Sequence, residues 1–496
     1  MCDEECNKAF ASDYLLLDPQ KFGIFELYHI LFSSDLEKRD FMERHPEGKD
    51  CKEENEKHRW IIFASLVAQK LLLCTAKPMA WLGSKIEYWL NLVQANRSLF
   101  GLIKNFVQCN VTYPIEGSAS FLSFTGCMDT RVELDQSIKP GDCRYYGALA
   151  VMASKASYEN KAYLEKTVKD HWNMELLDSF DFYNHYQNKR TTQAFMCRDK
   201  NPDNELIVVA FRGTETFDAD AWSSDIDLSW YELRSGTELR PGTGKVHGGF
   251  MKALGLQKSK GWPEKLDQID PEKPLAYYVI RDKLKELLSA NENAKFIVTG
   301  HSLGGALAIL FPAILAFHDE RLLLERLQGI YTFGQPRVGD KLFGDYMEGL
   351  LDSYKIQYLR YVYCNDMVPR LPYDDKSFLF KHFGRCLYFN SFYKGQVVVE
   401  EPNKNYFSPL YAVPQTLNAM WELVRGFYYA YSKGPNYKEP GILQVLRIIG
   451  LAIPGIPAHM LKDYVNACLS ASSELYMQLD LHKTNGSSLD QDQLSN

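Results

Sequence analysis

The stretch GHSLG, residues 300–304, places one serine between two glycines at the end of an apolar run. A serine hydroxyl attacks an ester only when a base takes its proton, and that base needs an acid to orient it. The G-x-S-x-G spacing suits such a nucleophile, because a sharp strand-to-helix turn leaves no room for side chains two positions away on either side. A glycine-rich helix start without catalytic function is the alternative. If Ser302 is a nucleophile, an acid and a histidine must lie elsewhere in the chain.

The segments around this motif predict a sheet that could position it. Four short apolar segments each end in a turn rich in glycine, proline or Asn/Asp, at residues 205–214, 294–300, 329–340 and 356–369. Helical patterns lie between them, for example at 274–290 and 303–318. This alternation predicts βαβ units and a largely parallel sheet. Active sites in such sheets form beyond the carboxyl ends of the strands, where Ser302 is expected.

In this type of sheet the acid follows the serine in the chain, and the histidine follows the acid. Asp366 stands directly after an apolar segment and before a proline-bounded loop, which favours it as the acid. Asp340 heads a helical pattern, so we predict it to be an N-cap residue. His382 and His459 both follow Asp366 in suitable loops. The residue pattern leaves the choice between these two histidines open.

The N-terminal part of the chain changes character near residue 57. Residues 1–57 carry 8 basic and 15 acidic side chains, whereas residues 58–112 carry 6 basic and 1 acidic side chain and are strongly apolar. The apolar run 60–76 is short for a membrane span and holds Gln69 and Lys70 near its middle, and Pro78 is expected to end it. We predict an interfacial helix or shallow hairpin on a lipid surface, with packing on the main domain as the alternative.

Cysteine usage and charge exclude several classes of protein. The eleven cysteines form no CxxC pair, and the acidic N-terminus does not resemble a secretory signal, so we expect reduced thiols in a cytosol-facing protein. The cysteine spacing predicts no metal site. No basic run is interleaved with aromatic residues, so nucleic acid is not an expected partner. The sequence carries no signal for a particular oligomeric state.

Six sequence blocks between residues 205 and 465 together resemble one family. They are FRGTETFDADAWSSDID, GKVHGGF, VTGHSLGGALA, YTFGQPRVGD, NDMVPRLP and IPAHMLKDY, and they occur in the order seen in class 3 lipases, the fungal-lipase-like branch of the α/β hydrolases. Long plant members that sit on oil bodies are the most similar, because they also have an N-terminal extension and an aromatic segment. The resemblance implies an α/β-hydrolase fold with a central, mostly parallel sheet, plus an N-terminal helical membrane-associating region.

The resemblance also implies roles for individual residues. Ser302 matches the nucleophile, Asp366 the acid and His459 the base, which decides between the two histidines. Thr214 matches the residue whose backbone N–H and hydroxyl complete the oxyanion hole, with the backbone N–H of Leu303 as the further donor. This chemistry needs no metal and no cofactor.

Two further segments are expected to contact lipid. The family places a mobile lid after the oxyanion residue, here at about 215–233 with Trp222 and Trp230, although a fixed acidic loop is the alternative. The aromatic insert at about 388–437 holds 13 aromatic residues in 50. One predicted helical face in it could contact a lipid surface, another subunit or the core. Its members are Leu417, Met420, Val424, Phe427 and Tyr431.

These features divide the chain into four parts: an acidic segment (1–57), a lipid-interface region (58–112), a lipase domain (113–470) and a polar tail (471–496). The predicted function is a triacylglycerol lipase that hydrolyses acylglycerols at the cytosol-facing surface of a lipid droplet (oil body), or at a membrane. Two alternatives are an acyl hydrolase of phospholipids or galactolipids and a lipase-like signalling scaffold without turnover.

Overall fold

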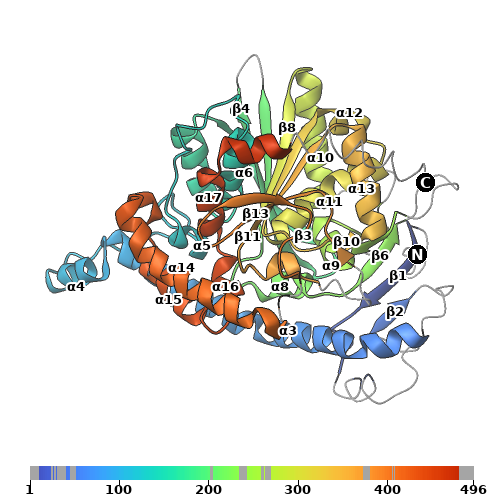
Figure 1. The fold of residues 1–496 in the computed structure, drawn as a ribbon, viewed down its shortest axis with the longest axis horizontal. Helices are drawn as coiled ribbons and strands as arrows, with labels where there is room; N and C mark the ends of the chain where they lie inside the picture. Colours follow the sequence, from blue (N-terminus) through green and yellow to red (C-terminus); the bar gives the residue numbers. More distant parts are fainter. Residues whose placement is uncertain are drawn as a thin grey trace.

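An eight-stranded sheet forms the centre of the molecule (Figure 1). The computed structural model describes residues 10–23, 26, 30, 41–44, 52–200, 205–233, 243–257, 262, 270–372, 380–404, 406 and 408–479. Five adjacent strands of the sheet are parallel: β5 (Leu206–Phe211), β8 (Lys295–His301), β9 (Leu327–Phe333), β11 (Gln357–Tyr363) and β13 (Arg385–Phe389). The antiparallel strands β3 (Glu175–Asn184), β4 (Lys189–Asp199) and β14 (Gly395–Val398) complete it in the order β14-β13-β11-β9-β8-β5-β4-β3. The four predicted strands and their parallel arrangement are therefore confirmed.

Helices cover both faces of this sheet, so alternate residues of one strand enter different cores. In β5, Ile207 and Val209 pack on one side, whereas Val208 and Ala210 pack on the other. A strand buried on both faces reads as a continuous apolar run, as the sequence does here. The first face is covered by α9 (Gly248–Leu254), α10 (Ala276–Ala290), α11 (Leu303–Phe317), α12 (Arg321–Arg326) and α13 (Lys341–Ser353). The second face is covered by α6 (Tyr145–Ala156), α7 (Lys161–Lys166) and α17 (Leu461–Ser470).

A second, antiparallel sheet of six strands joins the N-terminal segment to the catalytic domain. Its order is β12 (Phe380–Lys381), β10 (Gly339–Asp340), β7 (Lys245–His247), β6 (Trp230–Leu233), β1 (Ala11–Leu17) and β2 (Met42–Arg44). In β1, Tyr14 lies opposite Tyr231 of β6. The predicted boundary at residue 57 therefore does not separate two folding units, because β1 and β2 share a sheet with four strands of the catalytic domain.

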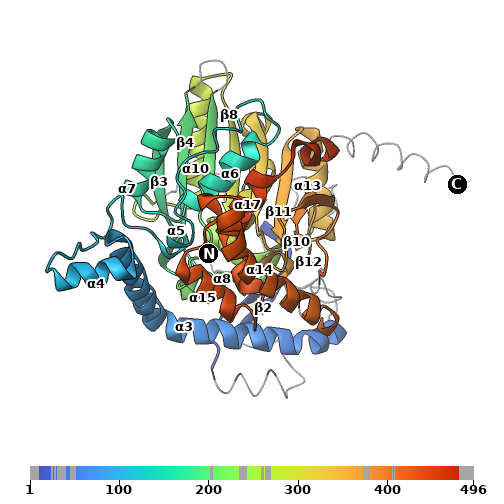
Figure 2. The ribbon, with the colours of Figure 1, turned by 60° about the vertical axis from the view of Figure 1, so that its left-hand side comes forward.

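The helix α3 (Lys52–Ala95) runs without interruption for 44 residues, so the prediction that Pro78 ends it was wrong. Pro78 is exposed and removes only one intrahelical hydrogen bond. Contacts on both sides of it hold the helix: Ser65 Oγ donates to the carbonyl oxygen of Ile226 at 2.6 Å, and the Asn91 side chain pairs with the backbone of Leu122. By length and composition alone α3 could cross a membrane, yet here it lies along the body of the protein (Figures 1 and 2).

The short helix α4 (Leu99–Val107) follows α3 and projects from the body in both views (Figures 1 and 2). The helix α5 (Phe124–Met128) then leads into the catalytic domain, and α8 (Ala219–Asp225) lies beside α3. The insert after β14 forms two larger helices, α14 (Ala412–Ser432) and α15 (Gly441–Ile449), followed by the single turn α16 (Gly455–Ala458).

The C-terminal tail begins later than the sequence predicts. Leu475, Tyr476 and Leu479 are buried in the core beside α6 and α17, and the hydroxyls of Tyr476 and Tyr361 lie 2.9 Å apart. The predicted start of the polar tail at residue 471 was therefore wrong, because three large side chains in residues 471–479 complete that core. Residues 480–496 lie outside the described part of the chain.

Candidate active site

The turn between β8 and α11 holds Ser302 in a strained conformation, with φ +57° and ψ −129°. Its backbone N–H donates to the carbonyl oxygen of Phe333 at 2.9 Å. A methyl group on Gly300 would lie 2.2 Å from the backbone of Gly304, and one on Gly304 would lie 2.3 Å from the carbonyl oxygen of Phe211. Neither position admits a side chain, which is the steric reason proposed for the G-x-S-x-G spacing. The turn therefore presents the Ser302 side chain at the first turn of α11, where the helix dipole favours negative charge.

Ser302, His459 and Asp366 meet at the carboxyl end of the central sheet. His459 Nε2 lies 2.9 Å from Ser302 Oγ, and His459 Nδ1 lies 2.8 Å from Asp366 Oδ2. Because a carboxylate only accepts hydrogen bonds, Nδ1 carries the proton and Nε2 is the nitrogen free to accept the serine proton. Ser302 is 3% exposed and His459 8% exposed, while Asp366 is fully buried. The structure thus brings together the three residues predicted as nucleophile, base and acid.

The alternative candidates for the base and the acid, His382 and Asp340, have structural roles instead. The side chain of His382 is 3% exposed, and its Nε2 lies 2.6 Å from the carbonyl oxygen of Pro369. Asp340 caps α13, where its carboxylate accepts a hydrogen bond from the backbone N–H of Phe343 at 2.9 Å. The predicted N-cap role of Asp340 is therefore confirmed.

Asp366 is held by donors that sequence reasoning missed. The backbone N–H of Val368 donates to Oδ1 at 2.9 Å, and the Tyr464 hydroxyl donates to Oδ2, the oxygen that also accepts from His459. Burial raises the pKa of Tyr464 well above its ordinary value, so this hydroxyl stays a neutral donor. The Arg370 guanidinium donates to the backbone carbonyls of Cys364 and Asp366. Together these bonds fix the carboxylate facing the imidazole.

Gly334 packs against the Asp366 carboxylate. Its φ is +60°, and a methyl group there would lie 2.9 Å from Asp366 Oδ2, so only glycine fits. His301 lies on the other side, with its ring centre 4.5 Å from that of His459. Burial lowers the pKa of His301 well below its ordinary value, so the ring is neutral. Its Nε2–H donates to the carbonyl oxygen of His459 at 2.9 Å, which leaves Nδ1 to accept from the Tyr158 hydroxyl at 2.8 Å. His301 therefore holds the backbone that carries the catalytic imidazole.

The two predicted oxyanion donors flank the serine. Leu303 is the first residue of α11, and amides of a first helical turn have no partner within the helix. A methyl group on Gly213 would lie 3.1 Å from Ser302 Cβ, so the chain leading to Thr214 passes directly beside the nucleophile. The Thr214 hydroxyl donates to Asp225 Oδ2 at 2.7 Å, and burial raises the pKa of Asp225 to about 7. The Thr214 hydroxyl therefore donates to α8 and not toward the serine, contrary to what the resemblance implies, and the backbone N–H is left as the donor of this residue.

The predicted lid at 215–233 is only partly compatible with the structure. Trp222 lies in α8, and its indole N–H donates to the carbonyl oxygen of Thr216 at 3.2 Å. Trp230 belongs to β6, paired with Leu15 of β1, and Lys245 Nζ lies 4.0 Å from the centre of its ring. The assignment of Trp230 to a mobile lid was therefore wrong: both edges of its strand are paired, and the partner strand β1 lies more than 200 residues away in the chain.

An apolar cluster from distant segments includes residues that are close in the chain to the oxyanion residue and to the catalytic histidine. Phe217 follows Thr214 by three residues and Met460 follows His459 by one, and both belong to this cluster. A methyl group on Gly83 of α3 would lie 2.6 Å from Phe217 Cβ, so α3 touches the segment after the oxyanion residue. The other members come from α3, α5 and α15: Ile86, Leu90, Phe124, Met128, Ile442, Leu443 and Leu446.

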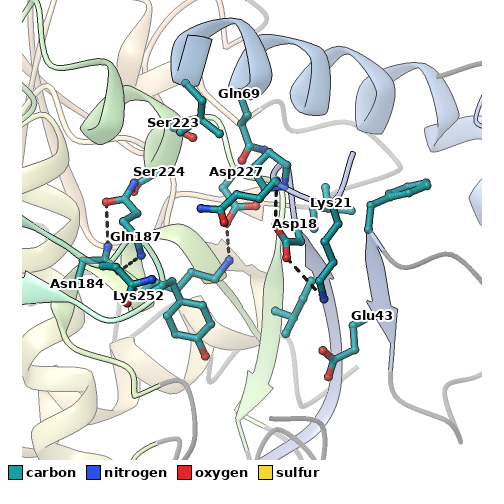
Figure 3. A pocket seen from close by; sticks show the side chains of 18 residues that line it. Asp18, Lys21, Glu43, Gln69, Asn184, Gln187, Ser223, Ser224, Asp227 and Lys252 are labelled. Atoms are coloured by element: carbon teal, nitrogen blue, oxygen red, sulfur yellow. Dashed lines mark hydrogen bonds and ion pairs between the residues drawn. The ribbon is translucent and has the colours of Figure 1, made fainter. Parts of the chain in front are cut away.

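Two hollows lie beside α8, and the triad lines neither of them. One, of about 280 Å³, separates α3 from residues 215–220. The other, of about 190 Å³, is polar and lies between β1, α3 and α8 (Figure 3). The ion pair between Lys252 and Asp227 lies in this polar hollow, with Nζ and Oδ2 2.7 Å apart. Within the described residues, no three His, Cys, Asp or Glu side chains gather where they could hold a metal ion.

A serine on a strained strand-to-helix turn, with a buried imidazole and carboxylate behind it on a parallel sheet, defines a serine hydrolase of the α/β type. The family model described as Lipase (class 3) matches residues 208–376. The chain is 40% identical to triacylglycerol lipase OBL1 of Arabidopsis thaliana over 95% of this chain and 97% of that relative, and 42% identical to triacylglycerol lipase OBL1 of Nicotiana tabacum over 85% of each. The chain therefore belongs to the class 3 lipase family. Among solved structures it is similar to lipase II from Rhizopus niveus, with 25% identity, a TM-score of 0.37, and coverage of 54% of this chain and 89% of that chain.

Proposed function

We propose that the protein is a triacylglycerol lipase that works through Ser302, His459 and Asp366. The hydrogen-bonded chain from Ser302 Oγ through the imidazole to the Asp366 carboxylate is the observation that carries this proposal. Ser302 Oγ attacks the ester carbonyl carbon while its proton passes to His459 Nε2, and the Asp366 carboxylate stabilises the imidazolium that forms. The backbone N–H groups of Thr214 and Leu303 stabilise the oxyanion, each contributing on the order of 3 kcal/mol.

The tetrahedral intermediate collapses when the carbonyl re-forms and the C–O bond to the glycerol moiety breaks. His459 Nε2 returns its proton to the leaving alkoxide, which departs as an alcohol and leaves the acyl group on Ser302. A water molecule then gives a proton to the same nitrogen and attacks the acyl carbonyl. The second collapse releases the fatty acid, and Ser302 recovers its proton. Atoms and charges balance without a metal or a cofactor.

Acylglycerols are proposed as substrates for two reasons. The relatives that match nearly the whole chain are named triacylglycerol lipases. The segments next to the oxyanion residue and the catalytic histidine are apolar at Phe217 and Met460, as suits a fatty acyl chain. A water-insoluble substrate in turn supports a cytosol-facing lipid-droplet surface as the place of action. The helix α3 and the insert helices α14 and α15 would contact that surface.

The decisive experiment offers the purified full chain emulsified trioleoylglycerol, phosphatidylcholine and galactolipid, and measures the fatty acid released. Wild type should prefer trioleoylglycerol, and Ser302→Ala should lose activity and labelling by a fluorophosphonate. Ser391→Ala is a matched control, because Ser391 is also buried but bonds Asn418 rather than a histidine. It should keep both activity and labelling.

Each other outcome rejects one part of the proposal. Equal rates for wild type and Ser302→Ala would reject the mechanism. A preference for phosphatidylcholine or galactolipid would replace the substrate with a polar lipid; a 28% identical relative over 42% of the chain is named phospholipase A1-IIbeta. An intact fold with neither hydrolysis nor labelling would favour a lipase-like scaffold instead.

A further inference from the structure

The insert helices α14 and α15 bury charged residues and expose apolar ones. Glu422 and Arg425 of α14 and Arg447 of α15 are each 1% exposed. The predicted apolar face of α14 points outward instead of into the core, and Tyr431 is 93% exposed. Its exposed members are Leu417, Met420, Val424, Phe427, Tyr428 and Tyr431, and α15 adds Val445, Ile448 and Ile449.

The buried charges form a network that fastens these helices to the catalytic domain. Arg447 bridges three carboxylates, at 2.6 Å from Glu439, 3.2 Å from Glu422 and 3.1 Å from Asp463 of α17. Arg425 Nη2 lies 2.7 Å from Asp463 Oδ1. Desolvating such charges costs free energy, while apolar side chains left in water gain none from burial. This arrangement suits helices whose outer side meets an apolar phase rather than water.

The helices α3 and α4 show the same pattern on the same side of the molecule. The polar side chains of Gln69, Asn91 and Asn96 are buried, whereas the large apolar side chains of α4 other than Leu102 face solvent, with Phe100 86% exposed. In both ribbon views α3, α4, α14 and α15 lie along one side of the body (Figures 1 and 2), and α3 and α15 pack together in one apolar cluster. Between residues 81 and 107 the exposed apolar members are Trp81, Leu82, Trp89, Leu99, Phe100, Ile103, Phe106 and Val107.

Every exposed charged side chain in residues 59–112 and 412–460 is positive. The exposed cations are Lys77, Lys85, Arg97, Lys104, Lys433 and Lys438. The acids in these two segments are Glu87, which is half-buried against α5, and the buried pair Glu422 and Glu439. The whole chain has a net charge of −7. The exposed apolar residues and these six lysines and arginines are called the cationic apolar face below.

We propose that the cationic apolar face docks on a phospholipid layer that carries anionic headgroups. The apolar side chains of α4, α14 and α15 enter the acyl region, and the surrounding lysines and arginines pair with the headgroups. A second copy of this chain fits less well, because two such faces would bring six cations against six like charges. This inference rests on the proposed function in one respect: the acylglycerol substrate lies beneath the phospholipid layer.

The test is flotation of the full chain with trioleoylglycerol droplets coated with phosphatidylcholine alone or with added phosphatidylserine. Ser302→Ala serves as the parent protein, so that hydrolysis does not consume the droplets. Lys77→Gln, Lys104→Gln and Lys433→Gln are combined in one variant, and Phe100→Asp with Phe106→Asp in another. Matched controls lie off the face: Lys139→Gln, Lys169→Gln and Lys295→Gln for charge, and Leu342→Asp for an exposed apolar residue.

We expect tighter binding to droplets that contain phosphatidylserine, and high salt should reduce that preference. Each lysine removed from the face should weaken binding to these droplets about fivefold, since one cation near an anionic surface contributes about 1 kcal/mol. The α4 variant should lose binding to both kinds of droplet. The controls should bind as the parent does.

Equal binding to both droplet types, or equal effects of face and control variants, would overturn the proposal. A parent that dimerises through α4, seen as a halved mass for the Phe100→Asp/Phe106→Asp variant in sedimentation, would assign the face to a second copy. In the active protein, all face variants should still hydrolyse a water-soluble short-chain ester at the wild-type rate. Normal flotation without trioleoylglycerol hydrolysis would reject the proposed function while leaving this docking surface supported.

Discussion

The helices α11 and α14 are both rich in apolar residues, but they bury opposite parts of themselves. In α11 every residue from Leu303 to Leu315 is buried against the central sheet and its neighbouring helices. In α14 the buried positions include Glu422 and Arg425, while Leu417 and Phe427 face outward. Both helices lie near the catalytic residues: α11 begins beside Ser302, and the network of α14 reaches α17, which follows His459.

We interpret this difference as the result of two environments, the protein core and the proposed lipid layer. Around α11 the favourable free energy comes from apolar burial within the protein, which pre-forms the strained turn at Ser302. Around α14 the protein itself supplies the polar partners, and the apolar side chains remain available for an external apolar phase. Chemistry and surface binding should therefore be separable by mutation.

The largest expected effect is the loss of catalysis in Asp366→Asn, with surface binding unchanged. An amide in place of the carboxylate would favour the wrong tautomer of His459, so the turnover number should fall about 10⁴-fold. The measurement is trioleoylglycerol hydrolysis together with droplet flotation. Asp340→Asn is the control, because asparagine caps a helix as well as aspartate does. If Asp366→Asn released the protein from droplets, the separation of chemistry from binding would fail.

The next effect concerns the buried charges beneath the exposed face. Arg447→Met should lower the free energy of unfolding by about 3–5 kcal/mol, because Glu422, Glu439 and Asp463 would all lose the buried cation that they share. Urea titration followed by fluorescence measures this change. The exposed Lys438→Met should change the free energy of unfolding by less than about 0.5 kcal/mol. Equal values for the two variants would mean that the charges do not hold α14 and α15.

A pair of leucines tests the comparison most directly. Leu310→Ala in α11 should cost about 2–5 kcal/mol of unfolding free energy, because Leu310 is fully buried. Leu417→Ala in α14 removes the same atoms from an exposed position and should cost less than about 0.5 kcal/mol in water. Denaturation of both variants beside wild type gives the two values. A large loss for Leu417→Ala would place that residue in a protein core after all.

The parallel sheet and the serine could be predicted from the sequence because their signals are local. Apolar runs, intervening helical patterns and the glycines of the elbow lie within short windows. Asp366 follows from its place at a strand end. The choice of His459 over His382 required the resemblance to a family, because both residues occupy similar loops and only the folded chain shows which ring faces Ser302.

The features that sequence reasoning missed depend on contacts between distant segments. The strand β1 pairs with β6, which lies more than 200 residues away in the chain, so the run ASDYLLL gives little signal by itself. Tyr464 and Gly334 reach Asp366 from α17 and from the end of β9. The only signal in the sequence for this contact was the glycine that follows the strand in YTFGQP, which is Gly334. The outward direction of the α14 stripe could not be predicted either, because an apolar helical face fits a core and a lipid layer equally well.

The smallest predicted effect is a pH dependence at α8, where Asp225 accepts a hydrogen bond from the Thr214 hydroxyl. Burial raises the pKa of Asp225 from its ordinary 3.8 to about 7, so the folded chain keeps a proton that the unfolded chain releases near pH 4. The stability that this proton gives is complete below about pH 4 and is lost as the pH rises through about 7. Because water partly screens this half-buried group, the total change should be on the order of 2 kcal/mol.

Asp225→Asn keeps an acceptor for Thr214 but cannot titrate, so its unfolding free energy should decline less over this range than that of wild type. Parallel slopes for the two proteins in urea titrations across the range would show that Asp225 ionises normally and that α8 does not bury it.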